Sequence, residues 1–371
     1  MNRLLPILAL ATAVIVASGV PLDAQNFPTS GWSTDFSRHS VPFEEIVSGG
    51  VPKDGIPALT NPSFVTIREA DRWIDDREPV ALIRVGEFVK IYPLQILIWH
   101  EIVNDQIGDL PVSVTFCPLC NTTIAFDRRH EGRTLEFGVT GNLRHSDMVM
   151  YDRQTETWWQ QATGEGIVGE LTGTTLTQVP APVVSWAQAR VDAPDGVVLS
   201  RETGYDREYG RNPYRGYDTQ DGPYPGFFSK RPDPRLDVME RVVAMGGEDD
   251  PVAVPFSALR ERRFIELEVN GEDVVVFWSP GTRSALDNRN MDKSRDVGSG
   301  VAFRPEAGGR SLTFELHQGG IRDRETGTSW DSMGRAATGP LVGERLEPIE
   351  HANHFWFAWA VFRPDTRIVR Q

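Results

Sequence analysis

The chain has 371 residues, of which 40% are hydrophobic and 24% charged, so it can bury a large core as two domains or one two-lobed unit. Its formal net charge of -14, without a dominant basic patch, argues against nucleic acid or an anionic membrane as partner. It contains no nucleophile elbow, P-loop, dinucleotide fingerprint or H-E-x-x-H motif, which disfavours serine hydrolases, NTPases, Rossmann dehydrogenases and HExxH metalloproteases.

Residues 1–24 are predicted to form a signal peptide. Arg3 supplies the basic region, Leu4–Ser18 are apolar apart from one threonine, and Ala24 is a suitable cleavage point. The apolar run is short for a membrane span, although a retained anchor is the alternative. We therefore expect an exported protein, periplasmic or secreted, with no membrane span after signal removal. Thiols in such compartments are normally oxidised or bound to metal.

The next elements are predicted from local pattern in chain order. Residues 25–75 are expected to form an extended leader that ends in a short helix. Alternating residues around Gly86 predict a pair of strands, and a proline-led apolar segment after them predicts a helix. The further elements are β-branched strands on either side of a C-x-x-C motif and one later helix. The expected ranges are Thr66–Asp76 (helix), Val80–Tyr92 (strand pair), Pro93–Asn104 (helix), Val112–Phe116 and Thr122–Asp127 (strands), and Ser185–Val191 (helix).

The sequence repeats itself. D-R-Q-T-E-T-W-W at Asp152 matches D-R-E-T-G-T-S-W at Asp323, and Val112–Phe116 matches Asp273–Phe277. The predicted fold class is therefore α+β, β-rich, with a tandem duplication of one β-rich unit in a pseudo-symmetric two-lobed protein. Copy one would span 76–200, a Tyr/Gly/Pro-rich connecting segment 201–234, and a degenerate copy two 235–371.

Both cysteines lie in copy one. Cys117-Pro118-Leu119-Cys120 falls between two predicted strands, which is typical of a metal-binding knuckle, whereas redox C-x-x-C motifs begin a helix. In the repeat alignment Cys117 and Cys120 fall on Trp278 and Gly281. His100 and His145 fall on Arg262 and Leu316, and this shared absence from copy two favours them as further ligands. The soft ligand set predicts copper or zinc.

Two other interpretations stay open at this point. The cysteine pair could be a redox-active dithiol, which would make the protein a thiol-disulfide oxidoreductase. It could also form a Cys117–Cys120 disulfide in a non-catalytic ligand-binding or structural module, since exported thiols oxidise readily. His100 could equally be a core histidine and His145 part of a solvated loop.

Candidates for catalysis are Glu101, which follows His100, and two residues of the connecting segment, Tyr214 and Tyr217. Five of the seven tyrosines lie in this segment, which is too aromatic for a passive linker. It is expected to cover a groove or the seam between copies. The partner would be a small molecule or protein that the sequence does not identify.

Several ordered blocks resemble one protein family. They are P-L-Q-I-L-I-W-H-E-I-V-N-D from Pro93, V-T-F-C-P-L-C-N-T from Val114, M-Y-D-R from Met150, W-W-Q-Q-A-T-G from Trp158 and Y-G-R-N-P-Y-R-G-Y-D from Tyr209. Together they look like the DUF3179 family of exported proteins of unknown function, over about residues 75–371. The resemblance implies that family motifs concentrate at His100, Glu101, Cys117, Cys120, Tyr209, Tyr214, Tyr217 and Asp218, and it carries no reaction.

Overall fold

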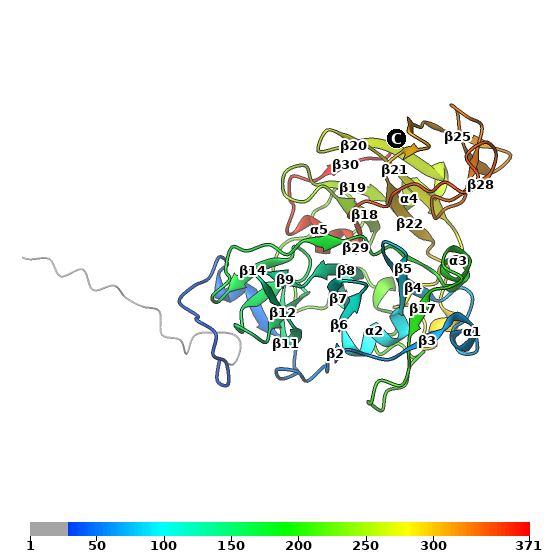
Figure 1. The fold of residues 1–371 in the computed structure, drawn as a ribbon. Helices are drawn as coiled ribbons and strands as arrows, with labels where there is room; N and C mark the ends of the chain where they lie inside the picture. The colour runs from blue at the N-terminus through cyan, green and yellow to red at the C-terminus, as the bar shows by residue number, and fades with distance from the viewer. Residues whose placement is uncertain (1–28) are drawn as a thin grey trace, which may run out of the picture.

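The computed structural model describes residues 29–371, so the predicted signal peptide at 1–24 lies outside the described residues. Within 29–371 there are thirty β-strands and five short α-helices, which confirms the β-rich class. We call residues 29–200 the first half and 235–371 the second half. Figure 1 shows the second half, with β18 to β30, stacked on the first.

The first half contains three five-stranded sheets and one two-stranded ribbon. The first sheet has the order β1-β11-β12-β13-β14, the second β15-β8-β7-β6-β2 and the third β16-β4-β5-β17-β3. The strands are β1 (Ile46–Ser48), β2 (Leu59–Thr60), β3 (Phe64–Thr66), β4 (Pro79–Val85), β5 (Phe88–Pro93), β6 (Ile102–Ile107), β7 (Leu110–Cys117), β8 (Thr122–Asp127), β9 (Arg129–His130), β10 (Arg133–Thr134), β11 (Phe137–Arg144), β12 (Asp147–Asp152), β13 (Trp158–Gln160), β14 (Glu165–Val168), β15 (Gln178–Val179), β16 (Val183–Ser185) and β17 (Val197–Leu199).

The second half has sheets of the orders β29-β18-β19-β30, β20-β21-β22 and β25-β26-β27-β28, with a β23-β24 ribbon. Its strands are β18 (Arg241–Met245), β19 (Val252–Pro255), β20 (Phe264–Val269), β21 (Glu272–Ser279), β22 (Ser299–Phe303), β23 (Glu306–Ala307), β24 (Arg310–Ser311), β25 (Phe314–His317), β26 (Gly320–Asp323), β27 (Ser329–Trp330), β28 (Ala336–Thr338), β29 (Ala352–Phe355) and β30 (Arg367–Ile368).

The helices are α1 (Ile67–Ala70), α2 (Leu94–His100), α3 (Trp186–Asp192), α4 (Phe256–Arg262) and α5 (Trp356–Ala360). The helix predicted to reach Asn104 stops at His100, because Glu101 takes a left-handed φ of 58° and β6 begins at Ile102. The Gly86 strand pair is confirmed as the antiparallel β4–β5 hairpin.

The two halves share strand pairings in the same chain order. β4 pairs antiparallel with β16 and β5 parallel with β17, while β18 pairs antiparallel with β29 and β19 parallel with β30. α2 follows β5 as α4 follows β19, and both helices begin after a proline. Each half then continues with a three-stranded meander, a short ribbon and a four-stranded antiparallel run.

A local motif also recurs in both halves. The indole N–H of Trp159 donates to Asp152 Oδ2 at 2.9 Å, and that of Trp330 donates to Asp323 Oδ2 at the same distance. Each aspartate also accepts the backbone N–H of a threonine three residues later, Thr155 or Thr326. These buried carboxylates fix the turn that follows each strand.

The hairpin register corrects the repeat alignment by one residue. The amide of Phe116 donates to Glu101 O at 2.8 Å, and the amide of Trp278 donates to Arg263 O at 2.8 Å. Phe116 therefore corresponds to Trp278, and Cys117 corresponds to Ser279 rather than to Trp278. A shift of one residue in the alignment of these two strands is difficult to detect from sequence, because both are runs of β-branched residues.

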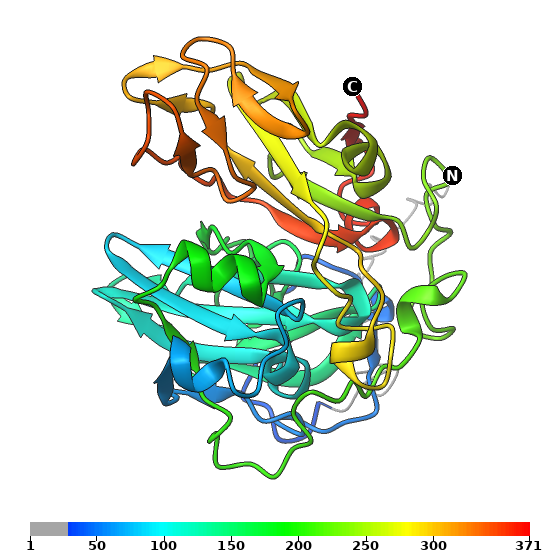
Figure 2. The ribbon, with the colours of Figure 1, turned by 90° about the vertical axis from the view of Figure 1, so that its right-hand side faces the viewer.

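The halves differ most in two segments. The β11–β12 hairpin spans Phe137 to Asp152, whereas its counterpart β25–β26 spans only Phe314 to Asp323. Conversely, the short C-x-x-C connection between β7 and β8 is replaced in the second half by the long segment 280–298. Figure 2 shows this yellow segment descending onto the first half.

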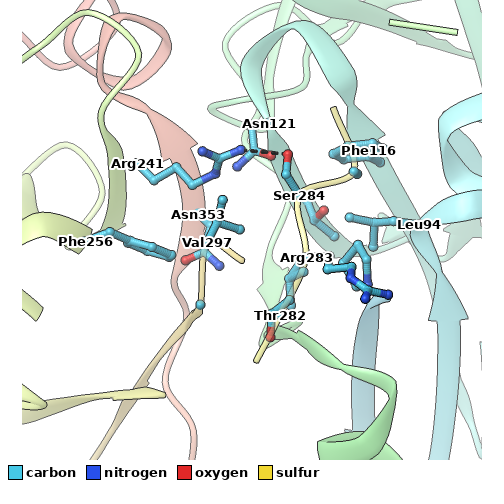
Figure 3. A pocket seen from close by; sticks show the side chains of 15 residues that line it. Leu94, Phe116, Asn121, Arg241, Phe256, Thr282, Arg283, Ser284, Val297 and Asn353 are labelled. Carbon is cyan, nitrogen blue, oxygen red and sulfur yellow. Dashed lines mark hydrogen bonds between the residues drawn. The ribbon is translucent and has the colours of Figure 1, made fainter. Parts of the chain in front are cut away.

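The halves meet along two seams. β8 of the first half lies beside β29 of the second, and β22, the counterpart of β8, lies beside β16, the counterpart of β29. Such reciprocal contact is what a two-fold axis produces in a homodimer. Between the seams lies a cavity of about 30 Å³, with room for about two waters. Arg241, Asn121, Ser284 and Asn353 line it (Figure 3).

No helix within residues 29–371 has the length and apolar character needed to cross a bilayer.

Candidate metal centre

The C-x-x-C motif forms a tight turn between two buried strands. β7 ends at Cys117, Pro118–Cys120 make one 3₁₀ turn, and Asn121 adopts a left-handed φ of 52° before β8 begins. The predicted strands on either side are thus confirmed. Both cysteines are free and buried, with exposed fractions of 1% and 0%. The turn holds both side chains in the same part of the core.

The turn of the extended β11–β12 hairpin reaches these cysteines. Arg144 pairs with Asp147, so His145 and Ser146 form a two-residue turn with φ values of 53° and 68°. Such turns normally use Asn-Gly, because non-glycine residues are strained at positive φ. The thiol of Cys117 points at the carbonyl of Ser146, with 3.7 Å between Sγ and O. A strained turn therefore lies directly against the knuckle.

Asp147 completes a cluster of three donors. One sulfur each from Cys117 and Cys120 and a carboxylate oxygen of Asp147 lie within 4.8 Å of one another, and all three residues are buried. Asp147 Oδ2 accepts hydrogen bonds from the Gln160 side chain at 2.6 Å and the Ala162 amide at 2.9 Å. Its Oδ1 is buried and accepts no hydrogen bond from an amide or hydroxyl of the described residues; the thiols of Cys117 and Cys120 face the carboxylate instead. A buried, unpartnered carboxylate oxygen is costly unless something compensates it.

Burial sets the electrostatics of this cluster. Desolvation raises the pKa of Asp147 to about 6, against the hydrogen bonds from Ala162 and Gln160, which lower it. It also raises the pKa of both thiols, Cys117 and Cys120. No described Lys or Arg forms an ion pair with Asp147. The site therefore gathers three groups that can each become anionic and offers no cationic side chain to balance them.

Glu101 is a second buried carboxyl beside the cluster. It is 7% exposed, and its side chain makes no hydrogen bond within the described residues. Desolvation, with the nearby charge of Asp147, raises the pKa of Glu101 to about 8. The charge of Glu101 in turn contributes to the raised pKa of Cys117 and of Tyr214, after burial. Glu101 and Tyr214 are therefore close enough to the cluster to interact with it electrostatically.

The Tyr-rich connecting segment, residues 205–228, covers the knuckle. Tyr217 is buried and donates its hydroxyl hydrogen to the carbonyl of Leu119 at 2.9 Å. The amide of Ser146 donates to the carbonyl of Phe227 at 2.7 Å. The segment is thus bonded both to the C-x-x-C turn and to the hairpin turn, so it closes the site from solvent.

Neither predicted histidine ligand belongs to the three-donor cluster. His100 uses both ring nitrogens elsewhere, with Nδ1 2.7 Å from Pro57 O and Nε2 2.7 Å from Tyr209 Oη. His145 lies two residues from Asp147 but directs Nε2 to Glu45 at 3.1 Å, while its buried Nδ1 has no partner. Burial lowers the pKa of both histidines, that of His145 to about 4.

Asp147 was missed by sequence reasoning, because the polar segment around His145 resembled a solvated loop. In the structure this segment is a buried hairpin, and its length relative to β25–β26 is the signal that could have found it.

Comparison with known proteins gives one match. The family model described as "Protein of unknown function (DUF3179)" matches residues 53–366. No curated protein and no solved structure matches the chain.

Proposed function

Because the chain belongs to the DUF3179 family, which has no assigned function, we propose from the site that it is a metal-binding protein and from the signal peptide expected at residues 1–24 that it is exported. Cys117, Cys120 and Asp147 hold a zinc or copper ion in this proposal. Two thiolates and a carboxylate suit such an ion, and a soft ligand pair disfavours calcium and magnesium. The observation that carries the proposal is the buried carboxylate of Asp147, whose Oδ1 accepts no amide or hydroxyl hydrogen bond and which lies beside two thiols.

Three protein ligands leave one position of a tetrahedral ion open. Glu101 and Tyr214 interact electrostatically with the cluster, so in this proposal they are the groups that would contact a substrate or fill the fourth place. When bound, the ion would act as a Lewis acid and would supply the positive charge that balances the two thiolates and the Asp147 carboxylate. The contact of Cys117 with the Ser146 carbonyl and the bond of Tyr217 to the Leu119 carbonyl hold the backbone that carries the cysteines. The site is thus proposed as an open metal centre under a tyrosine cover.

The rival interpretations from the sequence predict different chemistry. A reactive dithiol needs a lowered thiol pKa, and here burial raises the pKa of Cys117 and Cys120. That disfavours the thiol-disulfide oxidoreductase. A disulfide-clamped binding module would contain no free thiol and would keep the same metal content when Asp147 is changed.

The test is elemental analysis with free-thiol titration on one sample of purified protein, followed by zinc titration against a chromophoric chelator. We expect near-stoichiometric zinc or copper in the native protein and its loss in Cys117→Ser, Cys120→Ser and Asp147→Asn. Asp323→Asn, a buried aspartate of the second half, is the matched control and keeps its metal. His100→Ala and His145→Ala test the ligands predicted from sequence. Equal metal in the native protein and Asp147→Asn would refute the proposed ligand set.

We also propose that the chain arose by tandem duplication of one β-rich unit. The shared strand pairings, the Asp152/Trp159 and Asp323/Trp330 contacts and the reciprocal seams support this origin. On this view the first half kept or gained the longer hairpin that carries Asp147. The second half instead gained segment 280–298. An isolated second half that binds metal as tightly as the whole chain would contradict this division of roles.

A further inference from the structure

A large groove opens between the halves where β8 lies beside β29. Its volume is about 870 Å³, within the range of small-molecule sites. Both halves contribute to its wall, which is polar and apolar in about equal measure. Its larger apolar side chains are Ile124, Leu176, Met245, Val269, Val274 and Trp359.

The counterpart seam, between β22 and β16, is closed. There Asp192 forms ion pairs with Arg84 of its own half and Arg345 of the other. The side-chain amide of Gln188 donates to Ser279 Oγ at 2.7 Å and Ser332 Oγ at 2.8 Å. Since the two seams are equivalent in topology, the fold itself does not require the groove. The open seam is a particular property of the β8–β29 side.

The groove carries an excess of negative charge. Glu165 from the first half and Glu248, Glu347 and Glu350 from the second line it, and none of them forms an ion pair with a described Lys or Arg. Arg304 and Glu272 also line the groove, and they neutralise each other's charge in an ion pair of 2.8 Å. Only Arg363 remains as an unpaired cation in the lining. The lining is therefore strongly anionic above an apolar wall.

A buried histidine adds a directional group that is independent of these carboxylates. His354 is 1% exposed and lines the groove, and its ring packs at a tilt against Trp359 with 5.2 Å between the ring centroids. Its Nδ1 is 2.7 Å from Thr122 Oγ1, which itself donates to Cys120 O at 3.2 Å. Thr122 has one hydroxyl hydrogen, so both bonds form together only if His354 Nδ1–H is the donor.

The other ring nitrogen, Nε2, is then a hydrogen-bond acceptor, and it has no partner within residues 29–371. An acceptor that lines a groove without a protein partner is free to accept a hydrogen bond from a ligand that enters the groove. Carboxylates are also acceptors only. The unpaired carboxylates of the groove and His354 Nε2 all accept hydrogen bonds. They therefore favour a ligand that donates hydrogen bonds and carries a positive charge, and Arg363 is the exception among these groups.

We propose that this groove binds an organic cation, a primary ammonium or guanidinium group on an apolar stem. The cationic head is held by His354 Nε2 and by carboxylates from both halves, and the stem packs on Trp359 and the aliphatic wall. The same chemistry is offered by a free alkylamine and by a Lys or Arg side chain of a peptide. The site is separate from the cysteine cluster, although Thr122 joins the two through the Cys120 carbonyl.

The test is isothermal titration calorimetry of the full mature chain with hexylammonium, with hexanoate as the same stem carrying the opposite charge. A peptide with blocked termini and one central lysine distinguishes a peptide source from a free amine. We expect hexylammonium or the peptide to bind one site at least about tenfold more tightly than hexanoate. Whichever of the two cations binds more tightly identifies the source.

Variants place the ligand in the groove. The double change Glu347→Gln/Glu350→Gln should weaken cation binding about fivefold or more, whereas Glu87→Gln, an exposed carboxylate of the β4–β5 turn, should leave it unchanged. His354→Phe should weaken it as well if its circular dichroism matches the native protein; the surface double variant decides the matter if it does not. Cation binding should be the same in samples with and without bound metal, so this proposal can fail or succeed independently of the metal site. Equal binding of hexanoate, no binding of either cation, or no effect of the double variant would overturn it.

Discussion

The hydroxyl of Tyr217 donates a hydrogen bond of 2.9 Å to the carbonyl of Leu119, the residue directly before Cys120. The bond is buried and joins the connecting segment to the C-x-x-C turn. A 3₁₀ turn leaves backbone carbonyls without helical partners, so an outside donor stabilises it. Residues 205–228 and the C-x-x-C turn therefore form one structural unit.

Removing this donor should loosen the unit. In Tyr217→Phe the Leu119 carbonyl is left buried without its partner, which we expect to lower the free energy of unfolding by roughly 1–3 kcal/mol. Zinc affinity should fall with it, because the ligand backbone is held less firmly. Urea unfolding and chelator competition measure the two effects. Tyr205→Phe is the control, since Tyr205 is exposed; equal effects of both changes would contradict the role of Tyr217.

Relieving the strained hairpin turn should stabilise the protein. Ser146 has a φ of 68° and a buried hydroxyl without a partner, and Ser146→Gly removes both penalties while keeping the carbonyl that faces Cys117. We expect a gain of about 1 kcal/mol in the free energy of unfolding. Metal affinity should stay unchanged. Thermal unfolding and zinc titration are the measurements, and a destabilised variant would show that the turn is not strained.

The paired aspartates should behave as scaffold in both halves. Asp152→Asn and Asp323→Asn each replace a carboxylate oxygen, which accepts the indole N–H of Trp159 or Trp330, by an amide group that can itself donate. The donors of the indole and the amide then face each other. Each change should cost roughly 1–3 kcal/mol of stability, with similar size in the two halves. Metal content at a temperature where both variants are folded should not change. Loss of metal in Asp152→Asn alone would move Asp152 from the scaffold to the site.

Because of Glu78, the free energy of unfolding should decrease as the pH rises from 4.5 to 7. Burial raises the pKa of Glu78 from 4.5 to about 7, so in this window the native state binds more protons than the unfolded state. Its contribution is complete below pH 4.5 and is lost as the pH rises through 7. The loss amounts to roughly 3 kcal/mol from the size of the shift.

Urea unfolding of the native protein and of Glu78→Gln at pH 4.5 and pH 8 measures this contribution. The native protein should lose more stability over this range than Glu78→Gln, whereas Glu87→Gln should follow the native protein. Identical pH slopes for the native protein and Glu78→Gln would refute the assignment.

How far the sequence predicted the structure depended on the kind of signal. The strands beside Cys117 and the Gly86 hairpin were predictable, because β-branched alternation and a turn glycine specify them locally. The position of Asp147 was not, since a His145-Ser146 turn lacks the Asn-Gly signature of a tight hairpin. Asp147 is buried because residues 205–228 pack over it, and a contact with a segment so distant in sequence leaves no local pattern.

The histidines illustrate a different kind of signal. His100 was favoured as a ligand because the aligned position of the second copy has no histidine. Its ring nitrogens instead bond to Pro57 and Tyr209, two residues far away in sequence. Long-range partners of this kind cannot be read from spacing, and the ligand role predicted for His100 and His145 stays a prediction that the variants will test.

X-ray absorption at the metal edge of the metal-loaded protein tests the central claim most directly. For zinc we predict two sulfur ligands at about 2.3 Å together with oxygen ligands near about 2.0 Å. In Asp147→Asn, which loses the metal on purification and is reloaded with excess zinc, the oxygen shell should change, whereas in Asp323→Asn it should remain. A spectrum without sulfur ligands, or one that is identical in the native protein and Asp147→Asn, would contradict a metal centre built on Cys117, Cys120 and Asp147.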